Sequence, residues 1–245
     1  MRIDKYDIHQ FIQTVRVPAR EGTPDQASPF NLRFRARDLS PALRSSITGT
    51  CIYVGAMDDR VFYLGKYQPM NGNIINDRFA RHLQTVTGRG ADIGFGGRNN
   101  PGQRLQRLLA GVSDEHLRSA LVSAYETDRW RFKDTGCNTS PNRLRFASAC
   151  WAIFGTNDQA ILNRLSFTLI RMAPAAGQAE ARRRISLVEQ RLLGEFQPLC
   201  NANHRPAVDG APTPTCTVER VLQVTRAVMF DVTREDAHAC TTLGA

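Results

Sequence analysis

Two short, largely apolar stretches flank a polar turn near Asp58, and this pattern predicts a pair of strands within residues 46–67. Because side chains alternate between the two faces of a strand, every second residue of each stretch would lie on the same side of a sheet. Residues 165–173, LSFTLIRMA, alternate well enough to predict another strand. These segments predict the β-structure of the chain.

Apolar residues recur at helical spacing in other segments. In residues 76–86, for example, Phe79, Leu83 and Val86 form one stripe. Helices are predicted in the same way for residues 5–17, for two segments of 102–127 that break near Gly111, and for 179–196. Residues 144–155 and 218–232 are apolar but do not distinguish a helix from a strand.

The composition is that of an ordinary globular protein, with 42% hydrophobic and 22% charged residues. No apolar run approaches the length of a membrane span, and the charged first residues, MRIDKYDIHQ, lack the apolar core of a secretory signal. The six cysteines include no C-x-x-C pair, which argues against a disulfide scaffold. We therefore expect a cytoplasmic protein with no membrane partner.

The chain is strongly basic, with a formal net charge of +9. A positive surface attracts polyanions such as nucleic acids through its long-range field and through counterion release. Only three of the 32 basic residues are lysines, however, and an arginine bias of this kind also arises from a GC-rich coding sequence. Lys66 is notable because it is one of these few lysines and lies near the end of the second predicted strand.

Tyr53 and Tyr63 lie ten residues apart across the predicted turn. If the loop has an odd number of residues, positions whose numbers sum to 116 face each other, and the two tyrosines form a directly opposed pair on one face. Such an aromatic pair can simply stabilise the hairpin. A functional interpretation needs further polar groups on the same face.

Three further side chains are candidates for such groups. Arg78 and His82 lie four residues apart in the predicted helix 76–86, so they share one of its faces. The same spacing is found on an ordinary charged face that is exposed to solvent. Glu189 lies within the apolar stripe of helix 179–196, where a carboxylate costs free energy unless a cation or hydrogen-bond donors meet it. It is a boundary residue that reaches water, the partner of a buried arginine, or a ligand for a metal ion.

These pieces follow one another in a fixed order: CIY (51–53), YLGK (63–66), RFARH (78–82) and EQRLLGEFQPLCN (189–201). Together they resemble the GIY-YIG nuclease superfamily, in which a GIY strand and a YIG strand precede a helix with Arg and His. A later helix of that family carries a Glu, often trailed by a Pro and an Asn. The resemblance covers roughly residues 46–88 and 164–202. Cys51 stands where the family usually has Gly, and Leu64 where it usually has Ile, but neither change removes a reacting group.

The resemblance implies an α+β fold with a small three-stranded antiparallel sheet flanked by helices. The nuclease core would cover residues 46–202 and carry a helical insertion at about 89–162, between an N-terminal arm (1–45) and a C-terminal extension (203–245). Arginines of the insertion would hold phosphates or read guanine edges of DNA, unless they reflect the composition bias alone. They include Arg98, Arg104, Arg107, Arg129, Arg131, Arg143 and Arg145.

The resemblance also implies a role for each matching residue. Tyr53 and Tyr63 would flank the scissile phosphate, and one of them would help to activate the attacking water. Lys66 would lower the pKa of a neighbouring tyrosine. Arg78 would neutralise the phosphate as charge builds on its oxygens. His82 would relay a proton, because the ordinary pKa of histidine lies near neutrality.

Two more residues complete the implied site. Glu189 would hold one divalent cation, Mg²⁺ or Mn²⁺, which contacts the phosphate and stabilises the leaving oxygen. Asn201 would help to fix the geometry of the site. Neither tyrosine, nor Lys66, nor His82 is singled out by the sequence as the group that initiates attack by water.

We therefore expect a metal-dependent endonuclease that hydrolyses phosphodiester bonds of double-stranded DNA. A type II restriction-type, site-specific enzyme is favoured, and a symmetric site would then call for a homodimer on DNA. The alternatives are a repair, structure-specific or mobile-element nuclease and a non-catalytic nucleic-acid-binding module of the same fold. A third class is a basic interaction protein whose motif match is accidental.

Overall fold

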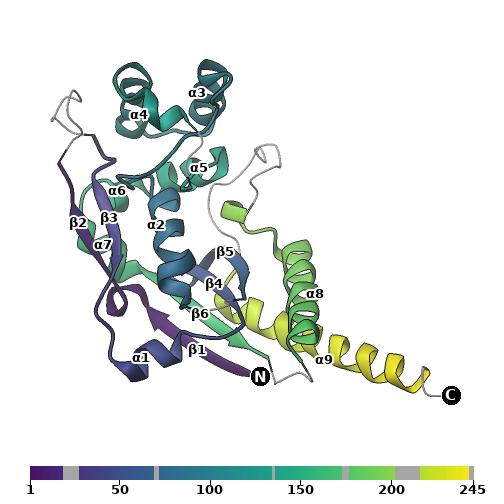
Figure 1. Cartoon of the computed structure of the whole chain (residues 1–245). Helices are drawn as coiled ribbons and strands as arrows, with labels where there is room; N and C mark the ends of the chain where they lie inside the picture. The colour runs from purple at the N-terminus through teal and green to yellow at the C-terminus, as the bar shows by residue number, and fades with distance from the viewer. Residues whose placement is uncertain (19–27, 69–71, 134–135, 173–176, 202–215, 243–245) are drawn as a thin grey trace.

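A computed structural model describes the chain except for residues 19–27, 69–71, 134–135, 173–176, 202–215 and 243–245 (Figure 1). The described residues form an α+β fold with two antiparallel sheets. The strands are β1 (Arg2–Asp7), β2 (Ile12–Arg16), β3 (Leu32–Ala36), β4 (Cys51–Met57), β5 (Arg60–Tyr67) and β6 (Leu165–Arg171).

Helices surround the sheets. The α-helices are α1 (Pro41–Ser46), α2 (Ala80–Val86), α3 (Pro101–Leu109), α4 (Glu115–Thr127), α5 (Pro141–Ala149), α6 (Trp151–Phe154), α7 (Asp158–Arg164), α8 (Gln178–Phe196) and α9 (Val218–Thr242). Shorter turns are η1 (Ile8–Gln10), η3 (Arg129–Phe132), η4 (Leu199–Asn201) and the π-helix η2 (Ile75–Phe79).

The main sheet has the order β1-β6-β4-β5, and so has four strands where the sequence predicts three. The additional strand is β1, which pairs with β6 from Ser166 to Arg171. The helix predicted for residues 5–17 is therefore wrong, since this segment forms β1, η1 and β2. Ile8, Phe11 and Ile12 are fully buried and their spacing imitates a helical stripe, but the strand pairing with distant β6 prevails.

Most other elements agree with the sequence pattern. The helices predicted at 76–86, 102–127 and 179–196 are confirmed, the first as the π-helix η2 running into α2. The strand predicted at 165–173 is confirmed as β6, and the two ambiguous segments are helical. Residues 1–45 supply β1 and both strands of the small sheet.

The hairpin of β4 and β5 turns on two residues rather than an odd number. Asp58 and Asp59 have φ angles of +47° and +66°, which are the left-handed values of a type I′ turn. The register shifts between Gly55 and Ala56, where a β-bulge interrupts the ladder. The even loop and the bulge together change which residues of the two strands face each other.

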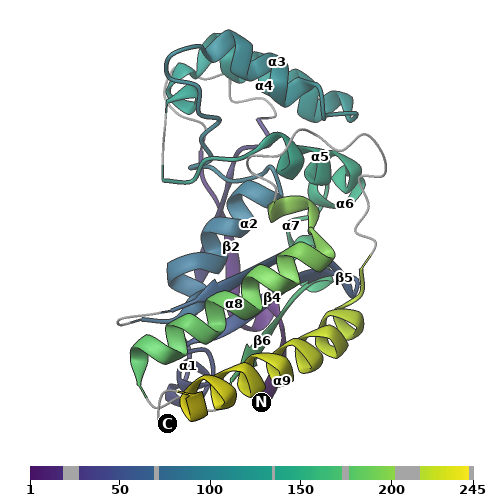
Figure 2. The same ribbon diagram turned by 90° about the vertical axis from the view of Figure 1, so that its right-hand side faces the viewer.

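The sheet separates two apolar clusters. One face packs against α2 and the helices of the insertion, with Tyr53, Phe79 and Phe167 in the buried cluster. The other face packs Ile52 and Leu64 against α8 and α9, which lie side by side (Figure 2). Helices α3 and α4 lie at the opposite end of the molecule from α9. Strand β5 is an outer strand of the sheet, and α8 and η4 approach it.

Candidate active site

Tyr53 and Tyr63 lie on the same face of the β4–β5 hairpin but do not oppose each other. Tyr53 pairs with Gly65, and Gly55 pairs with Tyr63, so the tyrosines are diagonal neighbours and the prediction of direct opposition is wrong. Their rings are stacked with centroids 5.7 Å apart. A Cβ atom at Gly65 would lie 3.0 Å from the Tyr53 hydroxyl, so the glycine of the YLGK motif makes room for this ring.

His82 reaches both tyrosines from α2. Its Nε2 lies 2.8 Å from the Tyr53 hydroxyl, and its ring centroid lies 4.3 Å from that of Tyr63. Burial lowers the pKa of His82 to about 3, assisted by the positive charges of Arg143 and Arg78. The imidazole is therefore neutral at physiological pH, and in the tautomer with a bare Nε2 the Tyr53 hydroxyl donates to it.

The Tyr53 hydroxyl keeps its proton. Burial is the main cause that raises its pKa well above the ordinary value, and the neighbouring Tyr63 adds to the effect. Arg78 lowers this pKa and Glu189 raises it, as smaller contributions. Both charges therefore act on the same hydroxyl although they come from different elements of the fold. Tyr53 is a neutral donor rather than a ready phenolate.

Arg78 lies in the π-helix η2, a rare conformation that occurs often at functional sites. A hydrogen bond from the Tyr67 hydroxyl to the carboxylate of Asp77, the residue before Arg78, ties this turn to β5. Arg78 is exposed, and no carboxylate of the described residues forms an ion pair with it. The positive charge of its guanidinium acts on three side chains and lowers the pKa of each of them: Tyr53, Tyr67 and His82.

Glu189 and Lys66 form an ion pair at the outer edge of the sheet. Glu189 Oε1 accepts a hydrogen bond from the backbone N–H of Lys66 at 2.9 Å, and Oε2 lies 3.1 Å from Lys66 Nζ. The ammonium also donates to the Ser186 hydroxyl at 3.1 Å. The partner of Glu189 is therefore a lysine, whereas the sequence suggested an arginine, a metal ion or water. The cation that lowers the pKa of Tyr53 is Arg78. Lys66 instead forms an ion pair with the carboxylate of Glu189.

Asn201 closes the same edge one step along β5. Its side-chain oxygen accepts from the backbone N–H of Leu64 at 2.8 Å, and its amide group donates to the carbonyl of Leu64. An outer strand leaves every second N–H and C=O without a strand partner. Asn201 and Glu189 occupy these positions, so they are held by the backbone between Tyr63 and Lys66.

A divalent cation fits Glu189 as a single acidic ligand. The carboxylate is 17% exposed, and each of its oxygens has lone pairs beyond those used by Lys66. Among the described residues, no group of three or more His, Cys, Asp or Glu side chains is arranged around one point. Mg²⁺ often binds through one carboxylate and completes its shell with water and phosphate oxygens, so this donor set suits an ion that the substrate helps to hold.

Arg143 is a residue of the site that the sequence does not single out. It comes from α5 of the insertion, and its guanidinium carbon lies 5.8 Å from the ring centroid of Tyr63. Nη1 donates to the Thr85 hydroxyl at 2.8 Å and Nε to the carbonyl of Cys200 at 3.3 Å. In the sequence it is one arginine of many in the insertion, and nothing in its neighbours distinguishes it.

Cys51, which replaces the usual glycine of the motif, belongs to the core. It is fully buried and pairs with Tyr67 across the hairpin. Burial raises the pKa of its thiol to about 12, so the thiol stays protonated and is no nucleophile. The side chain fills space in the cluster below the tyrosines.

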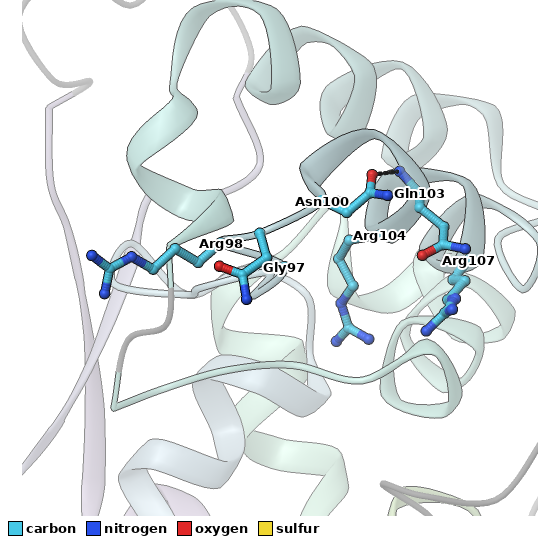
Figure 3. A pocket seen from close by; sticks show the side chains of 7 residues that line it. Gly97, Arg98, Asn100, Gln103, Arg104 and Arg107 are labelled. Atoms are coloured by element: carbon cyan, nitrogen blue, oxygen red, sulfur yellow. Dashed lines mark hydrogen bonds between the residues drawn. The ribbon is translucent and has the colours of Figure 1, made fainter.

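A second polar feature is a hollow of about 220 Å³ at the start of α3 (Figure 3). Arg98 and Arg107 are exposed at its margin, whereas Arg104 is fixed by the carbonyls of Phe95 and Thr139 at 2.6 and 2.8 Å. Asn100 caps α3 by accepting from the backbone N–H of Gln103 at 3.0 Å. The feature adds positive charge to the surface of the insertion.

Comparison with family models, with curated proteins and with solved structures returns no match for this chain. Within the described part of the chain, no helix combines the length and apolarity needed to cross a membrane. A functional assignment therefore depends on the chemistry of the residues themselves.

Proposed function

We propose that this protein is a metal-dependent endonuclease that hydrolyses phosphodiester bonds of DNA. The observation that supports this best is the 2.8 Å contact between the Tyr53 hydroxyl and Nε2 of His82, in the field of Arg78, which has no acidic partner among the described residues. Tyr53 and His82 are neutral and can pass on a proton from an attacking water molecule. Arg78 supplies a positive charge that can bind the anionic phosphate. This four-stranded sheet would contain the GIY-YIG-like core as β4, β5 and β6.

In the proposed reaction, a water molecule attacks phosphorus and gives its proton to the Tyr53 oxygen. Tyr53 passes its own proton to Nε2 of His82 in the same step, so the tyrosine never has to exist as a free phenolate. His82 becomes a cation as the phosphorane becomes more negative, and Arg78 neutralises that negative charge. The bond from phosphorus to the leaving sugar oxygen then breaks, that oxygen takes a proton from solvent water, and His82 returns its proton to solvent when the products leave. A bound phosphate would raise the pKa of His82, because it offsets the arginines that lower it.

Glu189 would hold the divalent cation, Mg²⁺ or Mn²⁺, which would supply charge stabilisation at the leaving oxygen. The backbone N–H of Lys66 holds one oxygen of the carboxylate in position, and the Lys66 ammonium occupies the other oxygen until the cation displaces it. Asn201 fixes the same edge of β5 through Leu64. These contacts orient the ligand before substrate arrives, which lowers the cost of assembling the site.

Double-stranded DNA is the proposed substrate because of the positive charge of the protein. The net charge of +9 and the exposed Arg98 and Arg107 beside α3 suit contacts with phosphates. A type II restriction-type enzyme acting as a homodimer would match a symmetric site. A repair, structure-specific or mobile-element nuclease would use the same chemistry, and cytoplasmic location stays an expectation.

The proposal is tested with supercoiled plasmid and Mg²⁺, using wild-type protein beside Glu189→Gln, which removes the charge but keeps the shape. We expect nicked or linear DNA with the wild type and almost none with the variant or with a chelator. DNA binding without cleavage by either protein would instead support a non-catalytic binding module. Sequencing of the ends would separate a site-specific enzyme, with repeated ends, from the other nucleases.

A further inference from the structure

We infer that Arg143 binds the scissile phosphate together with Arg78, so that the insertion supplies part of the active site instead of only covering it. This inference rests on the proposed nuclease function and names a second cationic ligand for its substrate. The carrying observation is that Arg143 is buried beside the tyrosine–histidine cluster and lacks an acidic partner among the described residues.

The other buried arginines of the described chain show what such a residue normally requires. Arg131 is 6% exposed and its Nε lies 2.8 Å from a carboxylate oxygen of Asp128. Arg89 is 3% exposed and its Nη2 lies 3.3 Å from a carboxylate oxygen of Asp158. A buried guanidinium is costly without a counter-charge, and both of these structural arginines have one.

Arg143 departs from this rule. It is 7% exposed, yet its two hydrogen-bond acceptors are neutral, the hydroxyl of Thr85 and the carbonyl of Cys200. Its Nη2 has no acceptor among the described residues. The protein therefore fixes a cation in place with neutral groups and leaves one nitrogen available. An anionic ligand would supply the missing counter-charge.

The position of Arg143 identifies that ligand with the substrate phosphate. Thr85, which holds Nη1, lies one turn after His82 on α2, and Cys200 precedes Asn201. The guanidinium lies against the ring of Tyr63, whose other neighbours are Tyr53 and His82. Arg143 and Arg78 both act on His82, so two cations from different parts of the chain converge on one neutral imidazole.

An arginine in this place has a defined chemical use. Its planar group can donate two parallel hydrogen bonds to phosphate oxygens, and it stays charged throughout the reaction. Nε gives its only N–H to Cys200, and Nη1 gives one of its two to Thr85, so the second N–H of Nη1 and those of Nη2 are the donors that would reach the phosphate. Because this guanidinium is already fixed, it can stabilise the negative charge that develops on the phosphate without the free-energy cost of ordering a mobile surface arginine.

The first test measures single-turnover cleavage of a labelled duplex by wild type, Arg143→Gln and Arg143→Lys. We expect a fall of about 100-fold or more for Gln, the range seen when one transition-state donor is removed, and a smaller fall for Lys. Arg220→Gln is the matched control, since it removes an exposed arginine of α9 for which no DNA contact is proposed, and it should change the rate less than about threefold. Circular dichroism and unfolding midpoints report whether each variant folds.

The second test separates contact with the phosphate from a structural tie between α5, α2 and η4. Duplexes with an uncharged methylphosphonate at the mapped cleavage position are compared with normal duplexes for binding in Ca²⁺. We expect wild type to lose affinity on this change, and Arg143→Lys and Arg143→Gln to lose at least threefold less, because the contact is already weakened or gone. Equal losses in wild type and both variants would overturn the inference.

The outcomes are distinguishable from failure of the proposed function. If wild type cleaves DNA and folded Arg143→Gln cleaves at the same rate, Arg143 is a structural residue and only this inference is wrong. If wild type cleaves nothing under any metal condition, the nuclease function and the inference fall together. If Arg143→Gln does not fold, the comparison of wild type with Arg143→Lys on the methylphosphonate duplex decides the question.

Discussion

The Tyr53 hydroxyl lies 2.8 Å from Nε2 of His82, and the pKa values of both groups depart from their ordinary values. The pKa of Tyr53 is raised and that of His82 is lowered to about 3, so both side chains are neutral at physiological pH. Two neutral side chains do not repel the anionic phosphate that we expect Arg78 and Arg143 to bind, and His82 can accept a proton from Tyr53.

His82 should stay neutral far below the usual range of histidine. NMR titration of labelled imidazoles should show one histidine without a transition above about pH 5, and His82→Gln should remove that signal. Because the folded pKa lies below the unfolded value of about 6.5, the contribution of His82 to stability is complete above pH 6.5 and is lost as pH falls toward 3. The unfolding free energy of His82→Gln should therefore vary less with pH in this window. A His82 pKa near 6.5 would contradict this reading of the site.

Gly65 should be required for the position of Tyr53. A methyl group there would lie 3.0 Å from ring and hydroxyl atoms of Tyr53 and from Tyr63, so Gly65→Ala must displace a tyrosine. We expect at least a tenfold loss of cleavage rate in a protein that still folds. Gly194→Ala is the control, because a Cβ there meets no atom within 4 Å and alanine favours helix by up to about 1 kcal/mol. Wild-type cleavage by Gly65→Ala would mean that the Tyr53 position does not matter.

Lys66 should compete with metal for Glu189. Its ammonium lies 3.1 Å from Oε2, so Lys66→Met removes a positive charge that opposes a second cation. We expect Mn²⁺, followed by electron paramagnetic resonance without DNA, to bind several-fold more tightly to the variant. Lys5→Met, which breaks an exposed ion pair with Asp59, should leave Mn²⁺ binding unchanged. Weaker binding by Lys66→Met would show that the lysine supports the metal site instead.

The exposed arginines of the α3 hollow should contact DNA phosphates. In Ca²⁺, the double variant Arg98→Ala, Arg107→Ala should bind duplex more weakly, and the slope of log affinity against log salt should become shallower by about two. Arg220→Ala, Arg226→Ala changes net charge equally on α9, at the other end of the molecule, and should have a much smaller effect (Figure 2). Equal effects of the two double variants would indicate only nonspecific attraction.

Local patterns in the sequence predict most elements, but not the contacts between distant segments. Strands β4, β5 and β6 and helices α2, α3, α4 and α8 follow from alternation and helical stripes. Strand β1 does not, because its partner β6 lies more than 150 residues away and Ile8, Phe11 and Ile12 imitate a helix. The same limit applies to the hairpin, where a two-residue turn and a bulge shift Tyr63 away from direct opposition.

The candidate site divides in a similar way. The seven residues chosen from the motif order lie around one end of α2 and the edge of β5, where Glu189 and Asn201 are held by backbone groups that no sequence pattern displays. The pairing of Lys66 with Glu189 depends on the packing of α8, so the sequence gives it a different role. The sequence names Arg143 only as one of several arginines of the insertion, since its burial without an acidic partner among the described residues is a property of the folded chain.

We expect Tyr53 and His82 to relay a proton during hydrolysis of DNA, and the sharpest measurement of this step is single-turnover cleavage by Tyr53→Phe. The substitution removes one hydroxyl and keeps the ring, so folding and DNA binding in Ca²⁺ should match those of wild type. We expect Mg²⁺-dependent cleavage by wild type and a rate at least about 100-fold lower for Tyr53→Phe. Equal rates for the two proteins, or no cleavage by wild type, would contradict it.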